Sequence, residues 1–243
     1  MKKKIIRTIG FLKGLILVFK PHLFLNWLRH PALLFSNTIS LSKWISNQDK
    51  GVLLNDFYSP LRDYDKRYQL YDHLITTLDL SNEKVNYLEF GVCGAYSFNW
   101  WVQNNKNSES KFYGFDTFEG LPENWGTFKK GDMSAEVPES DDARAKFIKG
   151  LFQDSLPPFL SHTPMEATTR KIIHLDADLF TSTLFVLTSL GSSLKKGDIL
   201  IFDEFNVPNH EFFAFKIFSD SFYVKTRLLG AVNNYFQVAL IVE

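Results

Sequence analysis

The 243-residue chain has a single cysteine, no excess of charge of either sign and no long uninterrupted hydrophobic run. The lone cysteine, Cys93, cannot form a disulfide within the chain, so we expect a reducing compartment, the cytoplasm. Lysine and arginine together number 27, as do aspartate and glutamate. This balance argues against a general nucleic-acid binder, because such proteins are usually basic over the whole domain. The sequence also has no internal repeat, and its length is typical of one large α/β domain with or without an appendage.

Residues 1–35 combine basic and apolar side chains. Lys13, Lys20 and Arg29 interrupt each apolar run well short of the roughly 18 residues that a transmembrane helix needs. A lysine cluster precedes an apolar stretch, as in a signal peptide, but no small-residue cleavage site follows. We therefore predict one or two amphipathic helices, and two uses remain open. They could lie on the inner, anionic face of a membrane with Trp27 at the interface, or pack on the main domain or on a second subunit of a homo-oligomer.

From residue 86 onward the chain alternates between apolar strands and helices, as a parallel α/β sheet requires. Five stretches read as strands: VNYLEFG, KFYGFDTF, KFIKGLF, KIIHLDAD and DILIFDEF. A short helix is expected after Asp154. Two final runs, YVKTRLLG and YFQVALIVE, flank Asn233-Asn234 and predict an antiparallel hairpin. We therefore predict a mostly parallel α/β sheet in a domain of residues 51–243, preceded by a basic amphipathic segment of residues 1–50.

The loop at residues 120–145 is polar and rich in glycine, proline and charge. It is too long for an ordinary connection between a strand and a helix, so we predict that it serves as a lid or a substrate loop.

The stretch YLEFGVCGAYS indicates a ligand site. Its strand delivers Glu89 to the carboxyl edge of the sheet, and Gly91 and Gly94 allow the backbone to approach a ligand closely before a helix begins. Asp116 ends the next strand, where an acid can accept both hydroxyls of a ribose. The alternative is that Asp116 only caps a following turn or helix. The sequence G-V-C-G lacks the full G-x-G-x-x-G pattern, which argues against a nicotinamide dehydrogenase.

Four acids follow the last two parallel strands: Asp176, Asp178, Asp203 and Glu204. Neighbouring strands would bring these carboxylates together, where they repel unless they are protonated or bridged by a cation. Oxygen ligands favour Mg²⁺ or Mn²⁺ over Zn²⁺. Two alternatives remain: Asp178 caps the next helix, or Asp176 and Asp178 form the D-x-D motif of a metal-dependent glycosyltransferase.

Five blocks, in this order, resemble the macrocin O-methyltransferase-like family: YLEFGVCGAYSFNWWV, FYGFDTFEGLPENW, FIKGLFQDSLPPFL, IHLDADLFTST and GDILIFDEF. The resemblance covers roughly residues 60–243. It implies a Rossmann-like class I fold, S-adenosylmethionine as methyl donor, and a small-molecule or glycan acceptor methylated on a sugar-type hydroxyl with Mg²⁺ or Mn²⁺. A non-catalytic scaffold associated with a membrane is the remaining alternative.

The resemblance also implies residue roles. Cofactor contacts fall on Glu89, Gly91, Gly94, Ser97, Asp116, Phe152, Gln153 and Asp154, and metal ligands on Asp176, Asp203 and Glu204. Two positions depart from the wider pattern: Ala95 replaces a second glycine, and Leu179 stands where catechol-type relatives carry a lysine. The proton of the attacking hydroxyl therefore goes to another group, and the two candidates are Asp176 and His210.

Overall fold

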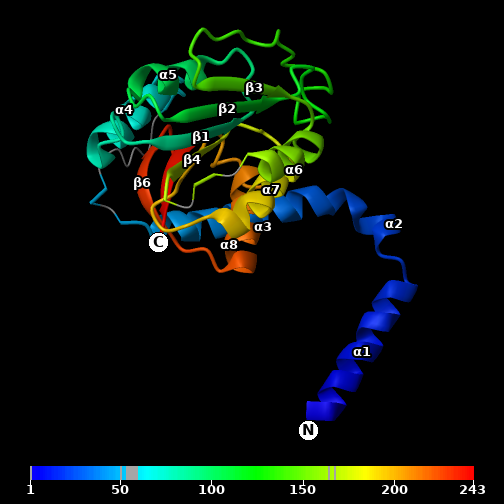
Figure 1. Ribbon diagram of the computed structural model, residues 1–243. Helices are drawn as coiled ribbons and strands as arrows, with labels where there is room; N and C mark the ends of the chain where they lie inside the picture. The colour runs from blue at the N-terminus through cyan, green and yellow to red at the C-terminus, as the bar shows by residue number, and fades with distance from the viewer. Residues whose placement is uncertain (1, 50, 53–59, 164, 167) are drawn as a thin grey trace.

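A seven-stranded sheet forms the middle layer of the molecule (Figure 1). The computed structural model describes residues 2–49, 51–52, 60–163, 165–166 and 168–243. The parallel strands are β1 (Val85–Phe90), β2 (Lys111–Asp116), β3 (Ala145–Lys149), β4 (Arg170–Leu175) and β5 (Ile199–Phe202). β6 (Thr226–Val232) and β7 (Gln237–Val242) form an antiparallel pair beside β5, in the order β3-β2-β1-β4-β5-β7-β6. The predicted α/β fold is confirmed.

Helices cover both faces of the sheet (Figure 1). α4 (Lys66–Leu78) and α5 (Tyr96–Asn104) pack on one face, whose strand residues include Tyr87. α3 (Arg29–Ser46), α6 (Phe152–His162), α7 (Phe180–Leu190) and α8 (Glu211–Phe222) pack on the other, whose strand residues include Leu88 and Phe90. Successive side chains of β1 therefore enter opposite cores, as the two-residue period of a strand requires.

The order of the strands reverses between β1 and β4. β1 pairs with β2 on one side and with β4 on the other, so the connections after them leave in opposite directions. Hydrogen bonds extend past the strand ends, because the Asp176 N–H donates to Phe90 O at 2.9 Å and the Asp203 N–H donates to Leu175 O at 3.0 Å. Open α/β sheets bind ligands in the crevice at such a switch point.

Two predicted boundaries shift. The strand predicted as KFIKGLF ends at Lys149, and α6 begins at Phe152 instead of after Asp154. The chain turns at Gly150, whose φ is +142°, so the apolar pair that follows opens the helix. The hairpin predicted at Asn233 forms with positive φ at 233, 234 and 235.

The N-terminal segment divides into an exposed part and a packed part. α1 (Lys2–Val18) buries no residue, and α2 (His22–Leu25) and a 3-10 turn at Asn26–Leu28 lead into α3. In α3, Asn37 and Leu41 are buried, and the ring of Trp44 lies 4.9 Å from that of Phe205. The far half of α3 therefore belongs to the core. The predicted boundary at residue 50, and residues 53–59 of the connector, lie outside the described residues.

Within the described part of the chain, no individual helix is long and apolar enough to cross a bilayer. Among the described helices, only one bent pair, Lys2–Val18 and His22–Ser46, which meet at 61°, passes that test by length and composition together.

Gly91 keeps the ends of β1 and β4 in close contact. Its φ is +92°, and a Cβ there would lie 1.8 Å from Asp176 O. Gly126 has a φ of +55°, but a Cβ there would meet nothing within 4 Å. Both Gly→Ala changes should cost roughly 1–2 kcal/mol of backbone strain. Gly91→Ala should cost about 1–3 kcal/mol more because the strand ends must separate.

Urea unfolding followed by circular dichroism measures both variants. Equal losses of stability would mean that the end of β4 moves aside freely and that Gly91 is not needed for the close contact.

Candidate active site

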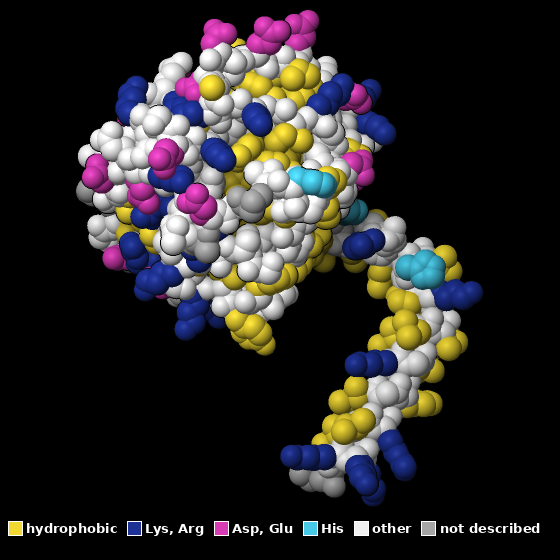
Figure 2. Space-filling model, in the orientation of Figure 1, with side chains coloured by type: hydrophobic (Ala, Val, Ile, Leu, Met, Phe, Trp, Pro, Cys, Tyr) yellow, Lys and Arg dark blue, Asp and Glu magenta, His cyan; other side chains and the backbone are white. Residues whose placement is uncertain are grey.

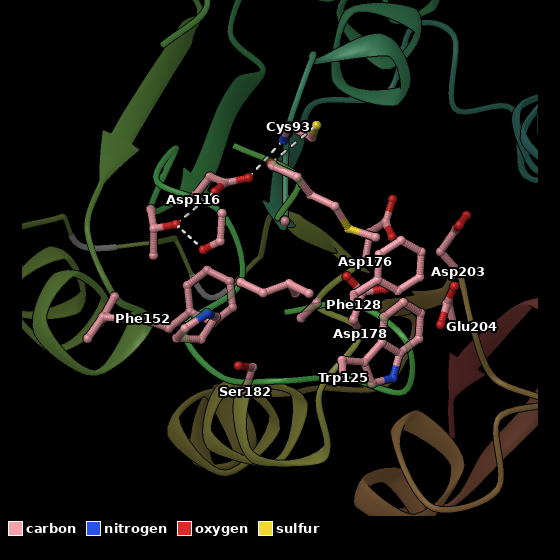
Figure 3. A pocket seen from close by; sticks show the side chains of 18 of the residues that line it. Cys93, Asp116, Trp125, Phe128, Phe152, Asp176, Asp178, Ser182, Asp203 and Glu204 are labelled. Carbon is pink, nitrogen blue, oxygen red and sulfur yellow. Dashed lines mark hydrogen bonds between the residues drawn. The ribbon is translucent and has the colours of Figure 1, made fainter. Parts of the chain in front are cut away.

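Asp116 ties the turn after β1 to the end of β2. Its Oδ2 accepts hydrogen bonds from the backbone N–H groups of Val92 and Cys93, both at 2.8 Å, and Figure 3 shows the bond from Cys93. Its Oδ1 accepts a third from the N–H of Phe118 at 2.8 Å. No helix begins after Asp116 in the described chain, where the next regular element is β3. Asp116 therefore orders the glycine turn and closes a local turn of its own, and it is not a helix cap.

A cavity of about 350 Å³ opens at the carboxyl edge of the sheet. Asp116 and Phe152 line one end of it (Figure 3), and Gly91 and Gln153 also belong to the lining. The acids after β4 and β5 line the other end (Figure 3): Asp176, Asp178, Asp203 and Glu204. The strand order thus brings the glycine turn and the acid cluster into one space, as the sequence predicts.

Arg67, from the first turn of α4, carries a positive charge into the acid cluster. Its guanidinium donates to Asp203 Oδ2 at 3.0 Å and lies 3.8 Å from Asp176 Oδ2. Burial opposes its charge, but Asp203 and Asp176 more than offset that effect and raise the pKa of Arg67. The guanidinium therefore stays protonated and bridges two strand ends.

The remaining carboxylates of the cluster are only partly compensated. Burial, with the nearby charge of Asp203, raises the pKa of Asp178 to about 7. Burial, with Asp178 and Asp203, raises the pKa of Glu204 to about 8. The pKa of Asp176 is raised well above its ordinary value, mainly by burial and then by the charge of Asp203. Without a further cation, the cluster therefore holds protons near neutral pH.

The donor set fits a divalent cation that prefers oxygen. Asp203 Oδ1 and Glu204 Oε2 are buried and have no hydrogen-bond partner among the described residues. Buried carboxylate oxygens of this kind usually carry a ligand or an ion. As the side chains stand, no three Asp, Glu, His or Cys groups in the described ranges lie close enough together to hold a metal. A cation here would therefore require side-chain movement, and Arg67 already contacts one of the carboxylates it would need.

Glu211 supports the cluster from behind. It is fully buried at the start of α8, and its Oε2 accepts the backbone N–H of Glu204 at 2.8 Å. Burial raises its pKa well above the usual range. Glu211 thus fixes the backbone that presents Glu204 to the cavity.

Five residues with predicted roles do not line this cavity: Glu89, Gly94, Ser97, Asp154 and His210. Glu89 is buried, accepts from the Tyr87 hydroxyl and lies 3.5 Å from His174 Nδ1. Ser97 accepts a hydrogen bond from Tyr71 at 3.3 Å. The roles of all five remain predictions.

His210 stands at the rim, next to the loop that follows β2. Its ring makes an edge contact with Trp125, with centroids 6.2 Å apart, and its Nδ1 accepts from the Phe180 N–H at 3.4 Å. Burial lowers the pKa of His210, against the opposing charge of Glu123, so the neutral ring is favoured.

No sequence pattern predicts the aromatic wall of the cavity. Trp125 and Phe128 stack with centroids 5.3 Å apart, and Leu121, Pro122 and Met133 of the same loop also face the cavity. The loop predicted to be a lid or substrate loop therefore supplies much of the apolar lining. Arg67 and Tyr64 were also missed as site residues, because only the fold brings them to the strand ends.

The family model described as Macrocin-O-methyltransferase (TylF) matches residues 65–230. Among solved structures, CalS11, a calicheamicin methyltransferase, is 22% identical with a TM-score of 0.55 and covers 85% of this chain and 91% of its own. The O-methyltransferase NovP is 18% identical with a TM-score of 0.53, and the match covers 73% of this chain and 78% of NovP. An apo structure of CalS11, described as a TDP-rhamnose 3'-O-methyltransferase, is 20% identical with a TM-score of 0.50. That match covers 85% of this chain and 93% of the CalS11 chain. No curated protein matches the chain.

The raised acid pKa values predict how stability changes with pH when divalent cations are absent. Asp178 and Glu204 have ordinary pKa values of 3.8 and 4.5, which apply when the chain is unfolded, but about 7 and about 8 in the folded protein. Between these limits the folded state binds more protons, so stability should fall as pH rises from about 4 to about 8. Thermal melts in EDTA across this range should show a declining Tm, and Asp178→Asn and Glu204→Gln should each flatten the decline.

Asp141→Asn, on the exposed loop, is the control and should leave the decline unchanged. A Tm that rises steadily over the same pH range in the unmodified protein would contradict the assignment.

Proposed function

The chain belongs to the macrocin-O-methyltransferase family, and from this membership we propose that it methylates a hydroxyl of a sugar or glycan-type acceptor with help from Mg²⁺ or Mn²⁺. The enzyme class itself is that of an S-adenosylmethionine-dependent O-methyltransferase. Family membership also argues against the glycosyltransferase and the non-catalytic scaffold as alternatives. One observation carries the proposal: a single cavity contains both the Asp116-ordered turn and the acid cluster.

The methyl donor suits the end of the cavity near Asp116. The carboxylate already accepts three backbone N–H groups, and its oxygens retain lone pairs for the two hydroxyls of a ribose. The Phe152 ring at the start of α6 lies close by in the lining and offers an apolar surface for an adenine. Gln153 beside it provides polar groups for the ring nitrogens.

The acceptor suits the opposite end, between the acids and the aromatic wall. CalS11, which shares the fold, is described as acting on a TDP-linked rhamnose. The stacked rings of Trp125 and Phe128 provide an apolar surface on which a sugar ring could pack. The nearby carboxylates supply hydrogen-bond acceptors for its hydroxyls.

The chemistry is a displacement at the methyl carbon. The acceptor oxygen forms a bond to that carbon, the carbon–sulfur bond breaks, and its electron pair remains on sulfur. The proton of the attacking hydroxyl goes to a carboxylate, for which Asp176 is the first candidate because its raised pKa makes it an effective base once ionised. His210 at the rim, with its neutral ring favoured, is the second candidate.

Asp176, Asp203 and Glu204 would hold the cation. When bound, it would act as a Lewis acid that lowers the pKa of the acceptor hydroxyl. Asp203 could ligate the cation through its unpartnered Oδ1, but the Arg67 hydrogen bond to Oδ2 neutralises part of the carboxylate charge and would weaken it as a ligand.

Asp116→Ala should weaken binding of S-adenosylhomocysteine by about 1–3 kcal/mol, measured by calorimetry, because buried hydrogen-bonding groups lose their partner. Asp72→Ala, an exposed change on α4, should leave the affinity unchanged. Since Asp116 also orders the turn, thermal melts should accompany the titrations. Unchanged affinity in a folded Asp116→Ala protein would exclude the ribose role.

Metal dependence can be tested with labelled S-adenosylmethionine and nucleotide-linked sugars. Methyl transfer should stop in EDTA and return with Mg²⁺ or Mn²⁺. Asp203→Asn should abolish transfer while S-adenosylhomocysteine still binds. Full transfer in excess chelator would overturn the metal role and leave the methyltransferase assignment intact.

Arg67→Met should also tighten Mn²⁺ binding, measured by electron paramagnetic resonance, roughly tenfold or more, because a hydrogen bond to a charged group is worth about 1.5–3 kcal/mol. Arg62→Met removes the same charge from the same cavity, but that guanidinium lies over the Phe236 ring at 3.4 Å. It should change Mn²⁺ affinity less. Equal effects would mean that Arg67 acts only through overall charge.

A further inference from the structure

Although the chain has no net charge, its basic and acidic residues are unevenly distributed along the sequence. Residues 1–48 contain eight lysines and arginines and no aspartate or glutamate. The remaining residues carry 19 basic and 27 acidic side chains. The N-terminal part is therefore positively charged, and the rest of the chain, the body, has a net negative charge.

The basic charge lies on an exposed element, which we name the N-terminal arm, residues 2–35. Figure 2 shows it extending away from the body with basic and hydrophobic side chains along its length. Ile5, Ile9, Leu12 and Ile16 follow helical spacing on one side of α1 and are 46–56% exposed. Such a stripe on a polypeptide in water is unfavourable unless another surface covers it.

The bend after α1 adds larger apolar groups. Phe24 and Trp27 are each 72% exposed, and the Trp27 indole N–H donates to Phe24 O at 3.0 Å. Tryptophan is enriched at membrane–water interfaces, where its ring is apolar and its N–H can reach a polar group.

The arm is anchored close to the cavity. The Asn37 side-chain amide donates to Asn209 Oδ1 at 2.9 Å, and Trp44 packs on Phe205 and Phe212. The segment from 205 to 210 follows Glu204 directly and ends at His210, which contacts Trp125 of the cavity wall. The base of the arm is thereby fixed to the body next to the cavity wall.

We propose that the N-terminal arm docks on an anionic lipid surface, with its apolar side chains among the acyl chains and its lysines at the headgroups. The charge argues against the pairing of two arms from two copies of the chain, because each arm carries seven positive charges and the two would repel each other. The apolar runs are short and interrupted by lysine, which suits a helix lying in the interface better than one that crosses it.

Vesicle co-sedimentation of the full chain tests the proposal. At low salt the protein should bind vesicles of phosphatidylcholine with about 30% phosphatidylglycerol, should bind pure phosphatidylcholine far less, and should dissociate in 0.5 M salt. Replacing Lys2, Lys3 and Lys4 together with Glu should weaken binding by roughly 100-fold, given about 1 kcal/mol per basic residue. The matched triple change of Lys146, Lys196 and Lys225 to Glu should have little effect.

Replacing Ile5, Ile9, Leu12 and Ile16 with Ser should also release the protein from vesicles. Because α1 has no buried residue, the Tm of this variant protein and its affinity for S-adenosylhomocysteine should not change. Absence of binding at low salt would overturn the proposal, as would equal binding to neutral vesicles or retention in alkaline carbonate. A dimer in sedimentation velocity that the Ser variant dissociates, without vesicle binding, would assign the arm to a second copy.

Discussion

The crowding of carboxylates at the ends of β4 and β5 is the constraint on which the rest of the site depends. Parallel neighbours bring Asp176 and Asp203 to the same edge, and their charges must be neutralised by protons, by Arg67 or by a cation. Each solution affects the others, since the guanidinium and a metal would compete for Asp203. The position of α4, which carries Arg67, is therefore as important to the chemistry as the strands themselves.

Much of the fold could be predicted from the sequence because its signals are local. Buried parallel strands give continuous apolar runs, and the acid at each strand end appears within a few residues. The end of β3 is an exception, because apolar residues continue past Lys149 into α6 and only the backbone at Gly150 separates the two elements. The family resemblance, since supported by the match to residues 65–230, added the identity of the methyl donor.

The missed parts of the site depend on contacts distant in sequence. Arg67 lies 136 residues before Asp203 along the chain, and nothing around it in the sequence indicates an acidic partner. Trp125 and Phe128 occur in a polar loop predicted to be a lid or a substrate loop, but its composition does not indicate which of its side chains face the cavity. The packed half of α3 was hidden for a similar reason, because Trp44 looked like part of the amphipathic segment until Phe205 and Phe212 provided its neighbours.

The separation of charge along the chain has a consequence for how the molecule moves before it touches anything. A protein with a formal net charge of zero experiences no net force in a uniform field, but one with a cationic arm on an anionic body experiences a torque. Near any charged surface it would rotate to present one end first, within roughly the 10 Å over which salt leaves such fields unscreened. The orientation of the molecule near the surface, and not only its attraction to it, would then depend on ionic strength. The net charge of the chain alone would not reveal this dependence.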